Sequence, residues 1–162
     1  MFYLCRVKNF GVTLDSNLSV SQHISNTCKA EYIQIRHITS IRHLLTTQAT
    51  QTPVSCLVLS RLDHCNSLLS GCPQYLQDRL QKVQNAAARL VCKAKKSVHI
   101  YLILQTLPWL PVTHRNQSNI STICFNSISG TAPQYLSDLF QPYTPARQLR
   151  SASDTRTFVT PV

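Results

Sequence analysis

Apolar residues recur at steps of three and four in several stretches of the chain, most regularly between Pro73 and Cys92. This spacing predicts an amphipathic helix over that stretch. One face of the helix would carry five apolar residues: Leu76, Leu80, Val83, Ala87 and Leu90. Pro73 suits the first helical position, where its missing N–H costs nothing. We expect Gly71, in the left-handed conformation, to end the helix that comes before.

Two longer patterns precede this helix. Ser19 and Gln22 have the spacing of a capping box, which predicts that a long helix begins at Ser19. Its apolar face is formed by Ile24, Cys28, Tyr32, Ile35, Ile38, Ile41 and Leu45. After the polar stretch 46–52, Pro53 occupies the place of a first helical residue behind a Thr52 cap. This arrangement predicts a second apolar helix that runs from Pro53 to Leu69.

The remaining elements are shorter. A segment capped by Ser97 is expected over 98–107, a helix with a weak apolar face over 112–129 that Gly130 ends, and a short helix over 133–140. Residues 6–15 alternate as a short strand does, although a strand is not stable without a partner. The chain is therefore predicted to be mainly α: a helical bundle of five to six helices with a short orphan N-terminal strand.

The charge of the chain is strongly positive. Sixteen Lys and Arg residues stand against six acidic ones, a formal net charge of +10, which favours a polyanionic partner such as nucleic acid or an acidic membrane surface. The helix at 73–92 places part of this charge within a sector of roughly 80° beside its apolar stripe. The candidate nucleic-acid-binding residues are Arg79, Lys82, Arg89 and Lys93, with Lys95 and Lys96 just beyond the helix. The alternative is an ordinary solvated helix face.

The sequence offers little for catalysis. The six acidic residues are scattered singly, so no pair suggests acid–base chemistry or a two-metal site, and no Gly-rich phosphate loop is present. The seven cysteines include no Cys-x-x-Cys pair, which predicts free thiols in a reducing compartment and neither metal nor other cofactor. No signal peptide or membrane-length apolar run is evident. We therefore expect a soluble intracellular protein, cytoplasmic or nuclear and not secreted.

Two single residues have competing interpretations. Trp109, the only tryptophan, is expected in the core rather than as a platform on which bases stack. Asp63 lies within the second predicted helix beside Arg61, where an exposed ion pair with a neighbouring base is the ordinary role of such a carboxylate. Neither residue is taken as catalytic.

Blocks of sequence in a fixed order resemble a known family. The blocks are Phe10–Ser19 (FGVTLDSNLS), His23–Ile24, Ser60–Asn66 (SRLDHCN), Leu80–Leu90 (LQKVQNAAARL), Trp109–Val112 (WLPV) and Gly130–Leu136 (GTAPQYL). They are similar to the end of the reverse transcriptase of non-LTR retrotransposons, of the LINE type and the CR1/L2 kind. The resemblance covers nearly the whole chain, from the last palm strand through the thumb and the helical region beyond.

The resemblance implies three regions: 1–18 as a remnant of the last palm strand, 19–140 as a helical thumb-like region and 141–162 as a flexible basic tail. In the family the strand completes the palm sheet, and the thumb lies along the primer–template duplex, a role that suits a basic helix. The aromatic-x-Asp-Asp turn and the upstream Asp that hold two Mg²⁺ ions in such polymerases have no counterpart here. The part that is similar to the family therefore grips the template and does not carry the chemistry.

This chain also departs from the family pattern. The family usually has Tyr in place of His64, His in place of Pro108, and one continuous helix where Thr52 and Pro53 interrupt it here. Apolar residues and lysines usually stand where this chain has Asn116, Ser118, Asn119 and Asn126.

Two functions follow as expectations. The first is a catalytically empty fragment, not an enzyme, that binds the backbone of an RNA or DNA duplex weakly and without sequence preference. The alternative is an inert or poorly folded product of a degenerate transposable-element reading frame. The sequence gives no indication of the oligomeric state.

Overall fold

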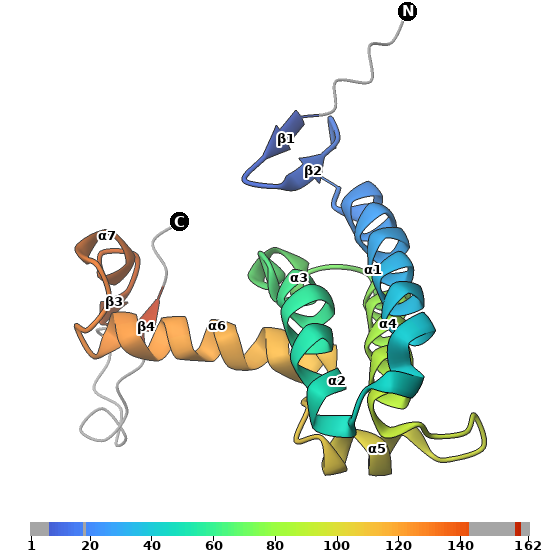
Figure 1. Cartoon of the computed structure of the whole chain (residues 1–162). Helices are drawn as coiled ribbons and strands as arrows, with labels where there is room; N and C mark the ends of the chain where they lie inside the picture. Colours follow the sequence, from blue (N-terminus) through green and yellow to red (C-terminus); the bar gives the residue numbers. More distant parts are fainter. Residues whose placement is uncertain (1–6, 18, 143–157, 160–162) are drawn as a thin grey trace, which may run out of the picture. The chain divides into compact units, whose positions relative to one another are not determined.

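The structure, a computed structural model, describes residues 7–17, 19–142 and 158–159. The chain divides into two compact units, Met1–Gln117 and Ser118–Val162. The fold is mainly helical with a short sheet near the N-terminus, which confirms the predicted fold class (Figure 1). Most of the predicted tail at 141–162, including its three arginines, lies outside the described residues.

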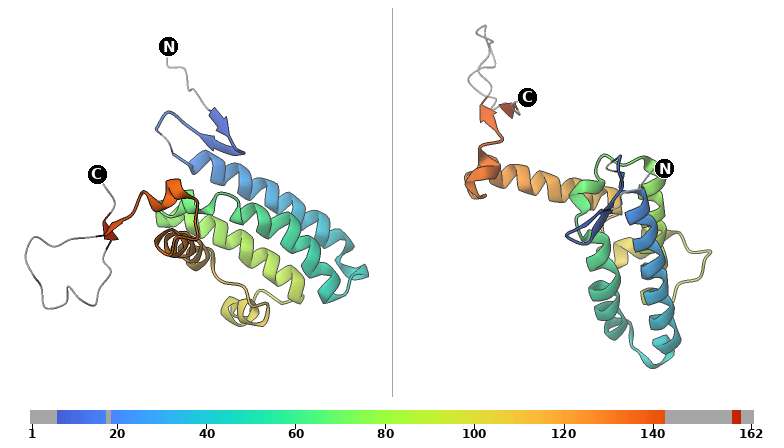
Figure 2. Two further views of the ribbon diagram at one scale, coloured as in Figure 1. Left: turned by 90° about the vertical axis from the view of Figure 1, so that its left-hand side faces the viewer. Right: turned by 90° about the horizontal axis from the view of Figure 1, so that it is seen from above.

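Three long helical segments lie side by side in the first unit (Figure 2). They are α1 (Ser21–Ile41), the continuous segment α2–η2–α3 (Thr47–Val54, Ser55–Leu59, Ser60–Asp63) and α4 (Gln74–Cys92). Shorter elements connect or follow them: η1 (Arg42–Leu44), η3 (Asn66–Leu69), α5 (Ile100–Thr106) and the start of α6 (Val112–Ile128). Helix α4 contacts α1, α2, η2 and α5, so it is the centre of the unit.

The apolar face predicted for α4 forms the middle of the core. Leu76, Leu80, Val83 and Ala87 are buried, and Leu90 is partly buried against the same cluster. The buried sector is wider than the predicted stripe, because Ala88, Val91, Gln77 and Gln84 are also buried. Full burial of a large aliphatic side chain contributes roughly 1.5–3 kcal/mol, so this face supplies the largest apolar contribution of any single helix.

The predicted capping box at the start of α1 is wrong. Helix α1 begins at Ser21 behind Val20, and no side chain caps its first turn. The Ser19 N–H instead donates to Asp15 Oδ1 (2.7 Å), and Ser19 Oγ accepts from the Ser21 N–H (3.2 Å). The Asp15 carboxylate thus draws the chain into a turn at Ser19, and the helix starts two residues later.

Pro53 neither starts a helix nor interrupts one. The helix begins at Thr47, where Thr46 Oγ1 accepts from the Ala49 N–H (3.2 Å), and it continues through Pro53 into the π-helical turn η2. An interior proline costs about 3 kcal/mol or more. Burial of Val54, Val58 and Leu62 on the core side contributes roughly 1.5–3 kcal/mol for each residue, which outweighs that cost.

The loops between helices also differ from expectation. Helix α3 ends at Asp63 and not at Leu69, because His64 is extended and Cys65 is left-handed (φ 54°). Gly71 does not have a positive φ, so the left-handed stop predicted there falls at Cys65 instead.

The starts of the next two helices differ from the prediction as well. Pro73 is the N-cap residue of α4, one position before the predicted one. Helix α5 is capped by His99, whose Nδ1 accepts from the Tyr101 N–H, and not by Ser97.

The predicted single strand is a hairpin. Strands β1 (Val7–Asn9) and β2 (Val12–Leu14) pair antiparallel, with Asn9 opposite Val12. Phe10 (φ 45°) and Gly11 (φ 83°) form the two-residue turn with positive φ that suits the twist of a hairpin. Val12 is buried, and β2 packs on α1, so the segment finds its partner within itself.

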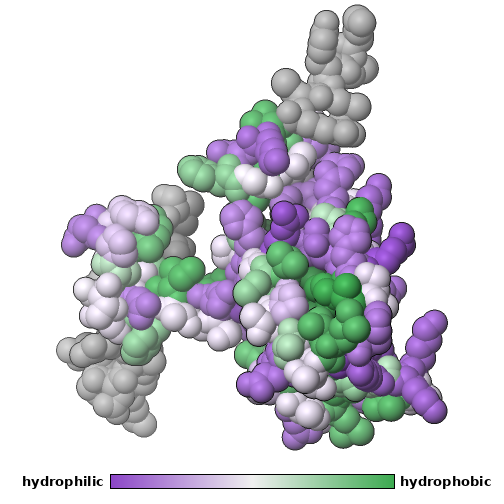
Figure 3. Space-filling view, viewed as in Figure 1, coloured by the Kyte–Doolittle hydropathy of each residue, from purple (hydrophilic) through white to green (hydrophobic). Residues whose placement is uncertain are grey.

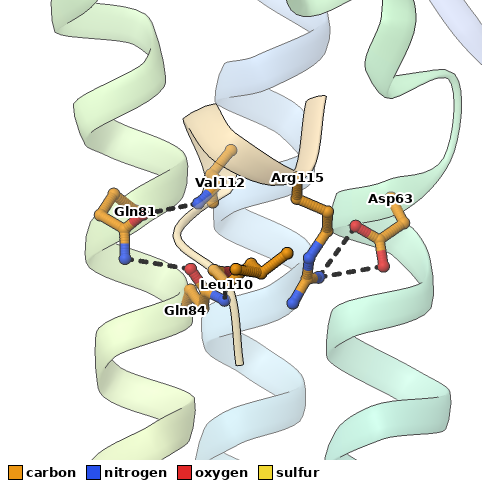
Figure 4. Close-up of polar contacts among 6 residues, drawn as sticks. All are labelled: Asp63, Gln81, Gln84, Leu110, Val112 and Arg115. Carbon is orange, nitrogen blue, oxygen red and sulfur yellow. Dashed lines mark hydrogen bonds and ion pairs between the residues drawn. The ribbon is translucent and has the colours of Figure 1, made fainter. Parts of the chain in front are cut away.

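Side chains of α4 and α3 hold the start of α6 in place (Figure 4). Gln81 Oε1 accepts from the Val112 N–H (2.8 Å), and Gln84 Nε2 donates to the Leu110 carbonyl (2.8 Å). Arg115 Nη1 donates to both carboxylate oxygens of Asp63 (2.9 and 3.0 Å). Asp63 therefore pairs with a distant base and not with a neighbour on its own helix. Trp109 is half-buried against the core, in agreement with its expected role.

The second unit contains the remainder of α6, which ends at Ile128 before a left-handed Gly130 (φ 72°), as predicted. The last helix, α7 (Gln134–Ser137), is shorter than the predicted 133–140 and begins behind Pro133. Strands β3 (Gln141–Pro142) and β4 (Phe158–Val159) pair antiparallel.

Leu80→Ala should lower the free energy of unfolding by about 2–5 kcal/mol, because the side chain is 1% exposed in the centre of the core. Urea unfolding followed by circular dichroism measures this change. The matched control is Lys82→Ala on the exposed side of the same helix, for which a change within about 0.5 kcal/mol is expected. Equal stability of Leu80→Ala and wild type would mean that α4 is not packed as described.

Candidate nucleic-acid interface

The six candidate residues differ in exposure. Lys82, Lys93, Lys95 and Lys96 are exposed, whereas Arg79 and Arg89 are partly buried. Lys93 is the left-handed residue (φ 51°) that ends α4, and the two following lysines lie in the turn beyond it. The lysines are therefore open to solvent, whereas the two arginines make contacts that their helical positions do not reveal.

Arg79 faces α1. Its Nη1 donates to Ser25 Oγ of α1 at 3.0 Å, and the side chain borders a groove of about 390 Å³ between the two helices. The groove is lined by Cys28, Lys29, Tyr32, Arg79 and Lys82. We call this the α1–α4 groove. It combines three cationic side chains with the exposed aromatic ring of Tyr32, a combination that suits phosphate contacts and base stacking.

Lys29 and Tyr32 are members of the groove that the sequence analysis did not select. They join Arg79 and Lys82 because α1 runs alongside α4 in the same direction. Ser25 meets Arg79 near the start of both helices, and Arg42 donates to the carbonyls of Leu90 and Val91 near their ends. No local pattern reveals this pairing, so only the tertiary contact identifies the two residues.

Arg89 lies in the last turn of α4, and its side chain reaches the loop that follows. Its Nη1 donates to the Lys95 carbonyl (2.7 Å), and its Nη2 donates to the Val98 carbonyl (2.9 Å). Backbone carbonyls beyond a helix C-terminus lack helical partners, and arginine side chains near that end commonly supply them. The side chain therefore closes the 93–98 turn, which engages two of the five N–H donors of its guanidinium group and fixes its orientation.

A second polar cavity of about 460 Å³ lies between the β1–β2 hairpin, α1 and α3. Its lining residues are Lys8, Gly11, His23, Thr27, Glu31, Ser60, Arg61 and His64. We call this the hairpin cavity. The sequence analysis assigned it no role. It contains the buried carboxyl group of Glu31.

Glu31 is fully buried, and neither of its carboxyl oxygens has a hydrogen-bond partner. Arg61 Nη1 is 3.8 Å from Glu31 Oε1, an ion pair too long for a hydrogen bond. Burial raises the pKa of Glu31 to about 7, and the nearby Arg61 opposes this rise only in part. The sequence contained a sign of this burial. Glu31 lies seven residues after Ile24 and seven before Ile38, so it falls on the predicted apolar face of α1.

Burial also disfavours the charged form of other ionisable groups. Burial and the neighbouring His64 lower the pKa of His23. Burial raises the thiol pKa of Cys28, Cys72 and Cys92, which keeps these thiols protonated and weakly nucleophilic. In the part of the chain that the structure describes, no three His, Cys, Asp or Glu residues gather as metal ligands. No helix among those residues has the length and apolarity needed to span a membrane.

Glu31→Gln should stabilise the protein increasingly as the pH rises. The pKa is higher in the folded chain than in the unfolded one, so wild-type stability from this group is complete below about pH 4.5 and is lost as the pH rises through about 7. Glutamine stays neutral throughout. The advantage of the variant should therefore grow by about 2–3 kcal/mol between pH 5 and pH 8. Denaturant unfolding at four pH values would measure it, and parallel pH profiles for the two proteins would contradict it.

The α1–α4 groove and the hairpin cavity, together with the amino-acid sequence, are the features from which a function can be inferred. No protein-family model, curated protein or solved structure matches the chain.

Proposed function

We propose that this chain is a non-catalytic nucleic-acid-binding fragment that contacts the backbone of an RNA or DNA duplex through the α1–α4 groove and the exposed lysines at the end of α4. The observation that carries the proposal is the gathering of Lys29, Arg79 and Lys82 around one groove from two helices. Binding would be weak and independent of base sequence, because contacts to phosphate carry no sequence information.

The dimensions of the basic surface support this proposal. Arg79 and Lys93 are fourteen residues apart on α4, which corresponds to about 21 Å along the helix axis. One strand of a B-form duplex carries a phosphate about every 3.4 Å, so such a span follows roughly six nucleotides. The net charge of +10 adds a long-range attraction to any polyanion.

The resemblance to the thumb region of LINE-type reverse transcriptases favours a duplex over other polyanions. In that family the region holds the primer–template duplex, and the corresponding part of this chain is the helical unit that bears the groove. The missing catalytic carboxylates are the reason that we propose binding without polymerisation. An intracellular location is part of the proposal, since the six described cysteines are all free thiols.

The alternative is that the chain is an inert product of a degenerate reading frame. Exposed apolar surface is the observation that favours it. Figure 3 shows an apolar area over α1 and the α2–α3 segment, elements on which Ile33, Ile41 and Leu57 are exposed. In the second unit Phe125 and Tyr135 are each 69% exposed. Apolar surface of this kind promotes self-association when no partner covers it.

The two proposals differ in the salt dependence of duplex binding. If the three groove cations and the three lysines at the end of α4 each contact a phosphate, the logarithm of the binding constant should fall against that of the salt concentration with a slope of about −5.4. Fluorescence anisotropy with a labelled duplex of about 20 base pairs measures the slope. The double variant Lys29→Gln, Lys82→Gln should flatten it by about 1.8.

Arg89→Gln is the matched control. It removes one positive charge from the same side of α4, but from a side chain that Nη1 and Nη2 hold against the Lys95 and Val98 carbonyls, outside the α1–α4 groove. The slope should stay near the wild-type value while the stability of the fold decreases. An unchanged slope in the double variant would refute the α1–α4 groove as the binding surface, and so would flattening by Arg89→Gln of half the amount seen in the double variant.

A further inference from the structure

The hairpin cavity is elongated along α1. His23, Thr27 and Glu31 line it at steps of four residues, so they form one stripe of the helix. Eight residues of helix correspond to about 12 Å between its two ends. Its volume of about 460 Å³ falls in the lower part of the range of about 300–1,000 Å³ that small-molecule sites occupy.

The inner end of this cavity requires hydrogen-bond donors. Both oxygens of the buried Glu31 are without a partner, and a buried polar group in this state is costly. Both oxygens are inaccessible in this conformation, so a ligand reaches them only when Arg61, the cation beside them, moves aside. The Arg61 side chain is 63% exposed, which allows such a movement. A ligand that presents two adjacent N–H donors would satisfy both oxygens at once.

The outer end attracts an anion. Lys8 comes from strand β1, and His23 and His64 come from α1 and from the residues after α3. His64 Nε2 lies 2.9 Å from the Phe10 carbonyl, which fixes the ring against the hairpin turn. Burial, together with the neighbouring His64, lowers the pKa of His23. At pH 8 this ring is therefore neutral and would contact a phosphate as a hydrogen-bond donor, with Lys8 supplying the positive charge.

We propose that the hairpin cavity binds a guanine nucleotide, with the base at Glu31 and the phosphate beside Lys8, His23 and His64. Guanine carries two adjacent donors, N1–H and the exocyclic amino group, on the edge by which enzymes read unpaired bases. Arg61 can then lie flat on the face of the purine, as guanidinium groups do on aromatic rings. An amino acid has donors and an anion too, but it is too short for a cavity of this length.

This inference is independent of the duplex-binding proposal, because the two sites share no residue. The guanine could come from a free nucleotide or from an unpaired guanine at the end of a nucleic acid. The chemistry at Glu31 is the same in both cases, and the ligands used in the test separate the two sources.

Isothermal titration calorimetry of the full chain at pH 8, where Glu31 is mostly ionised, tests the site. GMP should bind most tightly. IMP lacks the amino group and should bind about tenfold more weakly, and AMP, which lacks both donors in this arrangement, about 100-fold more weakly. Guanosine without its phosphate should lose affinity as well. A single-stranded oligonucleotide with one 5′-terminal guanine that binds more tightly than GMP would identify nucleic acid as the source, and weaker binding would identify the free nucleotide.

Three variants make this test specific. Glu31→Gln should weaken GMP binding at least tenfold while the fold is retained, since the change removes a buried charge. Lys8→Gln should weaken GMP binding but leave guanosine binding unchanged. Arg36→Gln, an exposed cation on α1 outside the cavity, should change neither. Equal affinities for GMP and AMP, an unaffected Glu31→Gln variant, or no GMP binding at millimolar concentration by the folded protein would each overturn the proposal.

Discussion

The burial of α4 is the constraint on which the rest of this structure depends. The helix contacts α1, α2, η2 and α5, and its buried sector includes two glutamines as well as the apolar stripe. Gln84 is fully buried, and both polar atoms of its side-chain amide are used: Oε1 accepts from Gln81, and Nε2 donates to the Leu110 carbonyl. A helix enclosed to this extent leaves few residues exposed, and Lys82 is one of them.

The same packing decides which cations can act together. Because α1 lies beside α4 in the same direction, Lys29 and Tyr32 come to border the groove that Arg79 and Lys82 also line. The loop that follows α4 gives Arg89 a different role, because the side chain closes this turn by donating to two of its backbone carbonyls. Cations on the same side of α4 thus have different roles: Arg79 and Lys82 border a groove that is open to a polyanion, whereas Arg89 stabilises the fold.

The hairpin cavity shows the opposite balance between stability and function. A buried carboxyl group whose pKa is raised to about 7 costs the folded chain free energy at neutral pH, and no contact within the described residues offsets that cost fully. An apolar residue at position 31 would continue the face of α1 formed by Ile24, Cys28 and Ile38. The retained carboxylate is therefore the best physical reason to look for a ligand at this place.

The amino-acid sequence by itself determined the class of the fold, the central helix and the positive surface, because helical periodicity and net charge are properties of local residue order. It also located the residues of α4 that face the core. Tertiary structure decided the rest. Burial of Val54, Val58 and Leu62 carried the helix through Pro53, Asp63 paired with Arg115 from a distant segment, and β2 packed on α1. The partners of the candidate sites were decided in the same way, since contacts between α1, α3, α4 and the hairpin arise from packing across the chain, which no local pattern encodes.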